Sequence, residues 1–386
     1  VGVNFGLGPL GEPETILFFI MTAISFLYMI ARGRTSHRLL TVVSWVFLWV
    51  LISLPVSSSV VRLDMHIFYL IYIFSVIVGG LIILDVFKNI DWNKVALHLF
   101  LMTFPIILCL ALITGIQAGP LWVYIDDLHR NYLVFTLCLA IAPLLVTFKT
   151  TQLSFKVIFI VTFFLLSYVN FVLGSVTGLI IILFLFFVYL VRVRLSLNLF
   201  MVFLGVAALL FLQAGSNSES SSNVWHRSIA HYEGIIENFK SGSYSYGSLS
   251  SQERTLMLVE GYSLVKENPI FGVGLFNTRW HWKRIMGHYE ETPGTHLHNL
   301  YLEIAASLGV FSLLLFLYFM YILLSKLIHS EKTPHNKIAL VWISCFLLIG
   351  ITNTIYTSVI FLFILSFVIY FGSVVLSEKP MKVSTS

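Results

Sequence analysis

The feature that most constrains this chain is a succession of eleven long apolar segments. They cover roughly residues 15–31, 39–54, 67–87, 95–114, 132–148, 155–173, 176–191, 195–212, 299–324, 338–352 and 354–376. A helix needs about 20 apolar residues to cross a bilayer, and most of these segments approach that length. Hydrophobic residues make up 58% of the 386 residues and charged residues 11%, more apolar surface than one soluble core can bury. The sequence therefore predicts an all-α polytopic membrane protein with about eleven or twelve transmembrane helices.

Two other classes of protein fit the composition poorly. The net charge is +5, but no stretch is densely basic, so nucleic acid is not an expected partner. The three cysteines, Cys109, Cys138 and Cys345, all lie inside apolar segments. We expect them to be small buried hydrophobic residues and not a disulfide framework.

The basic residues predict which side of the membrane each loop faces. If the first span starts outside, fourteen of the 23 lie in cytoplasmic connections: Arg32, Arg34, Arg38, Lys88, Lys94, Lys149, Lys156, Arg192, Arg194, Lys326, Lys332, Lys337, Lys379 and Lys382. The short external loops then carry only Arg62 and Arg130, and the other seven lie in one long loop. Short loops rich in Lys and Arg stay in the cytoplasm, so the long loop is predicted to be periplasmic.

A labelling experiment tests this orientation. A cysteine introduced at Ser218, in the long loop, should react with a membrane-impermeant thiol reagent in intact spheroplasts. One introduced at Ser330, in a predicted cytoplasmic connection, should be protected. The reverse pattern would invert the orientation.

The long loop, at about 213–296, is the part of the chain whose sequence is typical of a soluble protein. It opens with a polar linker at 215–223 and continues with an amphipathic pattern: Trp225, Ile229, Tyr232, Ile236 and Phe239. Ser250 and Glu253 form a capping-box pattern that predicts a second helix ending near Glu267. We therefore divide the chain into a transmembrane bundle (1–212), a helical periplasmic loop (213–298) and C-terminal transmembrane helices (299–386).

An enzyme on the outer face has neither ATP nor nucleotide sugars, so its glycosyl donor must arrive as a polyprenyl-diphosphate-linked sugar. Such a site needs a cationic clamp for the departing diphosphate and a base for the acceptor hydroxyl. Arginine matches phosphate oxygens with its planar fork, and histidine is a suitable base near neutral pH. His298, with His296 beside it in "HLHN", is the candidate base. The alternative is that both imidazoles merely occupy a helix start at the lipid headgroups; zinc is disfavoured because positions i and i+2 do not share a helix face.

Arg254 is the first candidate for the clamp, because it lies near the N-terminus of a predicted helix, where backbone N–H groups also attract anions. Arg62, Arg130 and Arg227 are further candidates for diphosphate contacts. Each of these arginines has a plain alternative as a solvated or ion-paired surface residue.

Three other polar features each allow two interpretations. The run "RWHWKR" at 279–284 is more typical of membrane-interface anchors than of a sugar-binding surface. Asp126 and Asp127 favour a solvated loop over a metal-assisted acidic pair. Glu303, one turn beyond His298, is expected to orient the site or to pair with an arginine.

An ordered set of motifs resembles the O-antigen ligase and polymerase family. It comprises "ER" at 253–254, then "NPIFGVG", then "THLHNLYLEIAASLG" opening a span. Similarity elsewhere rests on the span pattern and on "ARGR" after the first segment. Family members usually have twelve spans, so one is expected to be missing before the first segment or to be unrecognised.

The resemblance implies a membrane glycosyltransferase that needs no metal or cofactor. It places His298 as the catalytic base and Arg254 as the diphosphate-contacting arginine. The family commonly carries another arginine where this chain has Val176; either Arg62, Arg130 or Arg227 supplies the missing charge, or the alignment with the family slips at this position. The implied substrates are a glycan on undecaprenyl diphosphate and either the lipid A–core oligosaccharide, for a ligase, or a second lipid-linked repeat, for a polymerase. The "HLHN" doublet favours the ligase; a flippase is disfavoured because the span centres are nearly free of charge.

Overall fold

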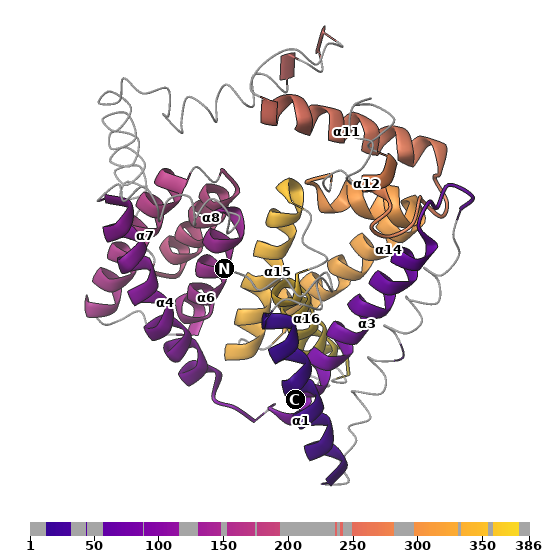
Figure 1. The fold of residues 1–386 in the computed structure, drawn as a ribbon. Helices are drawn as coiled ribbons and strands as arrows, with labels where there is room; N and C mark the ends of the chain where they lie inside the picture. The colour runs from indigo at the N-terminus through magenta and orange to yellow at the C-terminus, as the bar shows by residue number, and fades with distance from the viewer. Residues whose placement is uncertain are drawn as a thin grey trace, which may run out of the picture. The chain divides into compact units, whose positions relative to one another are not determined.

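The computed structural model describes residues 13–31, 44, 57–87, 89–115, 130–147, 153–173, 176–193, 236–237, 240–241, 249–281, 297–330, 333–353 and 358–377. All regular secondary structure in these ranges is helical (Figure 1). The helices are α1 (Pro13–Ala31), α3 (Leu63–Val86), α4 (Trp92–Gly115), α6 (Arg130–Thr147), α7 (Leu153–Leu173), α8 (Val176–Val193), α11 (Leu249–Glu267), α12 (Thr278–His281), α14 (Leu300–His329), α15 (Pro334–Thr352) and α16 (Val359–Ser377). The predicted all-α fold is confirmed.

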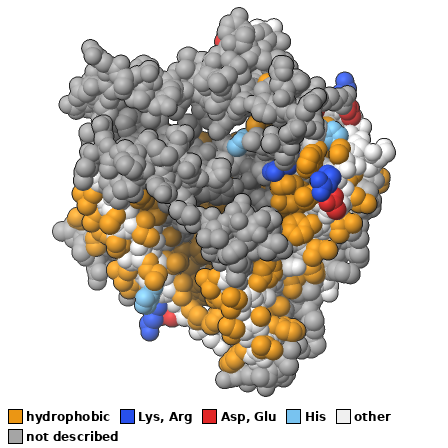
Figure 2. All heavy atoms as spheres, viewed as in Figure 1, with side chains coloured by type: hydrophobic (Ala, Val, Ile, Leu, Met, Phe, Trp, Pro, Cys, Tyr) orange, Lys and Arg blue, Asp and Glu red, His pale blue; other side chains and the backbone are white. Residues whose placement is uncertain are grey.

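Nine of the eleven predicted spans coincide with helices of the structure. Four of these, α3, α4, α14 and α15, are long and apolar enough to cross a membrane, and α1, α6, α7, α8 and α16 contain shorter apolar stretches. The predicted spans 39–54 and 195–212 fall almost entirely outside the part of the chain that the structure describes. Hydrophobic side chains cover most of the described surface seen in Figure 2. This is a polytopic membrane protein.

Residues 91–255 form one compact unit, in which α4, α6, α7 and α8 pack together. Its core is aromatic: Phe159 and Tyr189 stack with ring centroids 5.8 Å apart, and both are fully buried. Cys138 is buried in α6, as predicted, whereas Cys109 in α4 is exposed, so the prediction for that cysteine was wrong. Its neighbours on the helix, Leu108 and Leu112, are also exposed, and an apolar helix face of this kind is suited to lipid.

Residues 1–90 and 256–386 form a second compact unit, which contains α1, α3, α14, α15 and α16. The α3–α16 contact includes a buried hydrogen bond, in which the Tyr370 hydroxyl donates to the Asp85 carboxylate at 2.8 Å. This bond satisfies a carboxylate that would otherwise be costly inside a membrane helix. Cys345, in α15, is buried as predicted.

The start of α14 lies beside the end of α15. The Asn299 amide donates to the Ile351 carbonyl at 2.9 Å, and the Tyr301 hydroxyl donates to the Leu347 carbonyl at 2.7 Å. Asn299 also caps α14, because its side-chain oxygen accepts from the Leu302 N–H at 2.9 Å. The chain entering α14 is therefore fixed at one end of a membrane helix.

Some predictions about organisation remain predictions. The residues of the amphipathic pattern before Lys240 lie, apart from Ile236, in chain that is not described. The three-part division at 212 and 298 and the periplasmic position of the long loop rest on the sequence alone.

Candidate active site

The helix α14 is broken near its start, and the break holds a loop that follows α11. Gly309 has φ 86° and ψ 163°, a conformation that favours glycine. At the break, the carbonyls of Ala306 and Ser307 accept hydrogen bonds from the N–H groups of Val273 and Gly274, each at 2.8 Å. A Cβ at Gly309 would collide with the carbonyl of Ile270. The glycine thus permits a close approach that joins two distant parts of the chain.

Residues just before α3 and in its first turn form hydrogen bonds to the same loop. The Ser57 hydroxyl donates to the Gly272 carbonyl at 2.6 Å, and the Ser59 hydroxyl donates to the Asn268 side chain at 2.6 Å. His66, only 1% exposed, accepts the N–H of Leu275 on its Nδ1 at 2.8 Å. The loop from 268 to 277 is therefore fixed by hydrogen bonds and is a rigid support for its surroundings.

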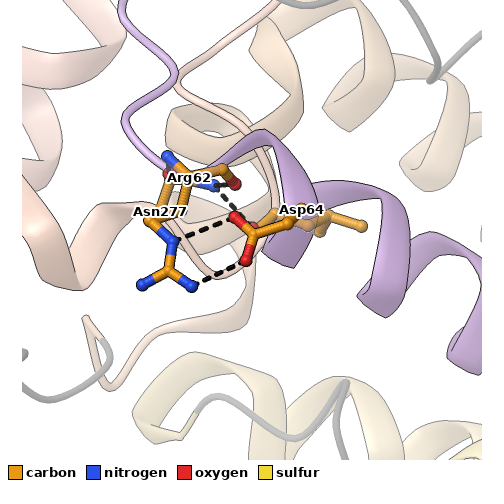
Figure 3. A network of polar contacts seen from close by, with 4 residues as sticks. Arg62, Asp64 and Asn277 are labelled. Atoms are coloured by element: carbon orange, nitrogen blue, oxygen red, sulfur yellow. Dashed lines mark hydrogen bonds and ion pairs between the residues drawn. The ribbon is translucent and has the colours of Figure 1, made fainter.

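Asn277 joins this loop to Arg62. Its side-chain oxygen accepts from the Arg62 N–H at 2.7 Å, and its amide donates to the Arg62 carbonyl at 3.0 Å. Figure 3 shows this contact together with the Arg62 guanidinium, which faces the Asp64 carboxylate in a two-bond pair at 2.9 and 2.6 Å. Hydrogen bonding to Asp64 raises the pKa of Arg62, so the guanidinium stays charged.

The buried carboxylate of Glu303 accepts hydrogen bonds from three segments of the chain. It is fully buried and accepts from the Thr278 hydroxyl at 2.7 Å, the Leu297 N–H at 3.1 Å and the Ser307 hydroxyl at 3.2 Å. Leu297 immediately precedes His298. Glu303 therefore helps to fix the backbone next to the candidate base, and its role in orienting the site stays a prediction.

His298 itself is held in an uncommon backbone conformation. Its φ is 51°, in the left-handed region, and its side chain is partly exposed. Leu297, on one side, is bonded to Glu303, and Asn299, on the other, caps α14. Such strain persists only where the surroundings impose it, and it is frequent at functional sites.

The helix α11 packs against this loop and ends at Glu267, as predicted, although it begins at Leu249, ahead of the predicted cap Ser250. Leu256, Met257 and Leu264 form a buried cluster with residues on either side of His298: Val273, Leu297 and Ala306. A Cβ at Gly261 would meet the side chains of Leu297 and Leu302 at 2.8 and 2.7 Å, so the helix approaches closely. Arg254 lies two residues before Leu256 on α11.

Residues 157–317 match the family model described as O-antigen ligase. This stretch is similar to the O-antigen ligase family. The match covers less than half of the chain but includes all three motifs at 253–254, 268–274 and 295–309. A comparison with curated proteins found no match. The resemblance inferred from the sequence is thus confirmed over residues 157–317.

The structure describes only some of the other candidate site residues. The Arg62 guanidinium is engaged by Asp64 and lies 5.4 Å from the Trp280 ring centre. Arg130 is the first residue of α6, and Val176, where an arginine was expected, begins α8. The side chains of Arg254 and Arg130 are not described, and neither are the residues Arg227, His296, Asp126 and Asp127.

Two residues that hold the loop from 268 to 277 were not recognised in the sequence. His66 lies at the start of a predicted span and Asn277 in the long loop, 211 positions apart in sequence. A histidine next to an apolar run was a usable signal, because a polar group there needs a partner. Asn277 gave no such signal, since an asparagine in a polar loop is ordinary.

Asn277→Ala is expected to lower the thermal unfolding midpoint of the purified protein in detergent by several degrees. The change removes a fully buried side chain and leaves the part-buried N–H and carbonyl of Arg62 without their two hydrogen bonds. Asp64→Ala is the matched control, because an ion pair exposed to water contributes little to stability. Equal midpoints for the two variants would contradict the role assigned to Asn277.

Proposed function

We propose that the protein is an O-antigen ligase that transfers a glycan from undecaprenyl diphosphate to a hydroxyl of the lipid A–core oligosaccharide. The reaction takes place at the periplasmic face of the bacterial inner membrane. The acceptor oxygen attacks the anomeric carbon, the bond from that carbon to the diphosphate oxygen breaks, and undecaprenyl diphosphate leaves with the electron pair. A direct displacement of this kind inverts the configuration of the sugar.

The observation that carries the proposal is the constrained backbone at His298. The acceptor hydroxyl must lose a proton, and His298 takes it as general base. Its neighbours are fixed by Glu303 and by the end of α15, so the backbone that carries the imidazole is held at the end of a membrane helix. That is where a lipid diphosphate and a membrane-anchored acceptor can meet.

Arg254 contacts the diphosphate and stabilises the charge that develops as the bond breaks. Its helix is anchored through Leu256 and Met257 to the cluster that includes Leu297. Arg130, Arg227 and His296 are further contacts for the diphosphate or the glycan. Arg62 contacts a phosphate oxygen through the guanidinium N–H groups that do not bond to Asp64.

Deleting the gene and examining lipopolysaccharide on a gel distinguishes the candidate reactions. A ligase predicts the loss of all long chains on the core and the accumulation of lipid-linked polymer. A polymerase that uses a second lipid-linked repeat as its acceptor predicts a core carrying a single repeat unit. An unchanged ladder would contradict both.

Transfer by the purified protein is expected to survive chelation by EDTA. The diphosphate is a good leaving group, and an arginine can stabilise its negative charge without a metal ion. Among the described residues, no group of three or more His, Cys, Asp and Glu side chains has metal-ligand spacing. Loss of transfer in EDTA, with recovery on adding a divalent metal, would contradict this mechanism and direct attention to Asp126 and Asp127.

A further inference from the structure

The turn that follows α11 exposes two large apolar side chains. Ile270 is 65% exposed and Phe271 44% exposed, directly after Asn268 and Pro269. Two adjacent apolar residues on a tight turn are a poor surface for water, and an exposed apolar patch commonly marks a contact with a partner or a membrane. The position of this turn relative to the membrane helices indicates which of these it meets.

The first measure of depth comes from α14. From the break at Gly309 to His329, the helix runs for about 20 residues at about 1.5 Å each, so it spans about 30 Å, the thickness of the hydrocarbon core. The Pro269 carbonyl accepts the N–H of Val310 at 2.8 Å, immediately after the break. The turn therefore lies level with one edge of the hydrocarbon core.

The second measure comes independently from α3. Its start carries the exposed pair Arg62 and Asp64, which belongs outside the hydrocarbon core. From His66 to Val86 the helix again runs for about 20 residues, or about 30 Å. His66 bonds to Leu275, and Gly274 bonds to Ser307 of α14. Both helices thus place the segment 269–275 at the same edge.

We infer that the turn Asn268–Phe271 inserts Ile270 and Phe271 among the acyl chains of the bilayer, and that lipid is the partner of this surface. The exposed apolar face of α14 continues from the turn, because Phe311 and Leu314 are 60% and 58% exposed just beyond the break. Backbone polar groups in lipid must be paired. Of the backbone groups just before the two inserted residues, the Asn268 carbonyl accepts from Gly272 at 3.0 Å, the Pro269 carbonyl accepts from Val310 at 2.8 Å, and proline has no N–H.

The insertion has a consequence for the candidate base. Val273, three residues after Ile270, packs in the cluster that contains Leu297, and its N–H bonds to Ala306. A turn seated in the lipid therefore sets the depth of the residue that precedes His298. The lipid contact rests on the membrane fold and not on the proposed reaction, so either can fail without the other.

Site-directed spin labelling tests the lipid contact directly. The three native cysteines are replaced with alanine, and single cysteines are introduced at Ile270, Phe311 and Lys266. The full-length protein is labelled with a nitroxide and reconstituted in vesicles of phosphatidylethanolamine and phosphatidylglycerol. Collision of each label with oxygen, which concentrates in lipid, is compared with collision with a water-soluble nickel chelate.

The label at Ile270 should resemble that at Phe311, with oxygen collisions well above nickel collisions. The label at Lys266, exposed on the last turn of α11, should show the opposite preference and serves as the aqueous control. A nickel-accessible label at Ile270 would place the turn in water and overturn the inference. Protection from both reagents would also overturn it, because the surface would then be covered by protein.

Discussion

Replacing His298 with alanine is expected to lower glycan transfer by about 10²–10⁴-fold, the usual contribution of a general base. The imidazole removes the proton of the acceptor hydroxyl, and alanine has no group that can do so. Transfer is measured as the initial rate with the purified variant in lipid vesicles. Folding is checked by the thermal midpoint, because alanine tolerates the left-handed backbone at this position poorly.

His298→Asn is the variant that separates chemistry from backbone strain. Asparagine adopts the left-handed conformation more readily than most residues and cannot act as a base at neutral pH. It should therefore keep the thermal midpoint and lose activity as fully as alanine does. His296→Ala should have a much smaller effect, since one imidazole suffices. A near-normal rate for His298→Asn, or a greater loss at His296, would remove His298 from the base position.

Arg254→Lys is expected to abolish most transfer even though the positive charge is retained. The planar fork of arginine makes two parallel hydrogen bonds to phosphate oxygens, whereas an ammonium group acts as a single point charge. Loss of such transition-state contacts typically costs about 10²–10³-fold in rate. The measurement is the initial rate of transfer at saturating donor, followed by the rate at low donor to separate binding from turnover.

Lys266→Ala is the matched control for this second prediction, because Lys266 is exposed at the other end of the same helix. It should leave the rate unchanged. Arg227→Ala should be milder than Arg254→Lys. Near-normal transfer in Arg254→Lys would show that the residue contributes charge alone and is not a two-bond diphosphate ligand.

Features encoded locally could be predicted from the sequence. The apolar segments predicted helices such as α7 and α15 to within a few residues of their observed ends. The length of an apolar segment determines whether it can span a bilayer, whatever its neighbours are. The end of α11 at Glu267 followed from Asn268 and Pro269, since proline disfavours a helical conformation in the residue before it. The motif around His298 was likewise visible because its parts are contiguous.

Features made by distant contacts could not be predicted. The break at Gly309 exists because the loop after α11 donates hydrogen bonds to Ala306 and Ser307, and a glycine within an apolar helix does not reveal that partner. The pairing of Arg62 with Asp64 is local, but its attachment to Asn277 joins positions 215 residues apart. The prediction for Cys109 was wrong for a different reason. Apolar neighbours in the sequence do not distinguish a residue that faces lipid from one that is buried in the protein core.

The most direct test of the central claim uses the purified protein in vesicles that contain undecaprenyl-diphosphate-linked glycan and lipid A–core. Acceptor and donor are followed together by mass spectrometry. The proposed ligase predicts that each glycan appearing on the lipid A–core is matched by one released undecaprenyl diphosphate, and that His298→Asn abolishes both. Glycan joined only to a second lipid-linked repeat, or donor that crosses the bilayer without any transfer, would contradict it.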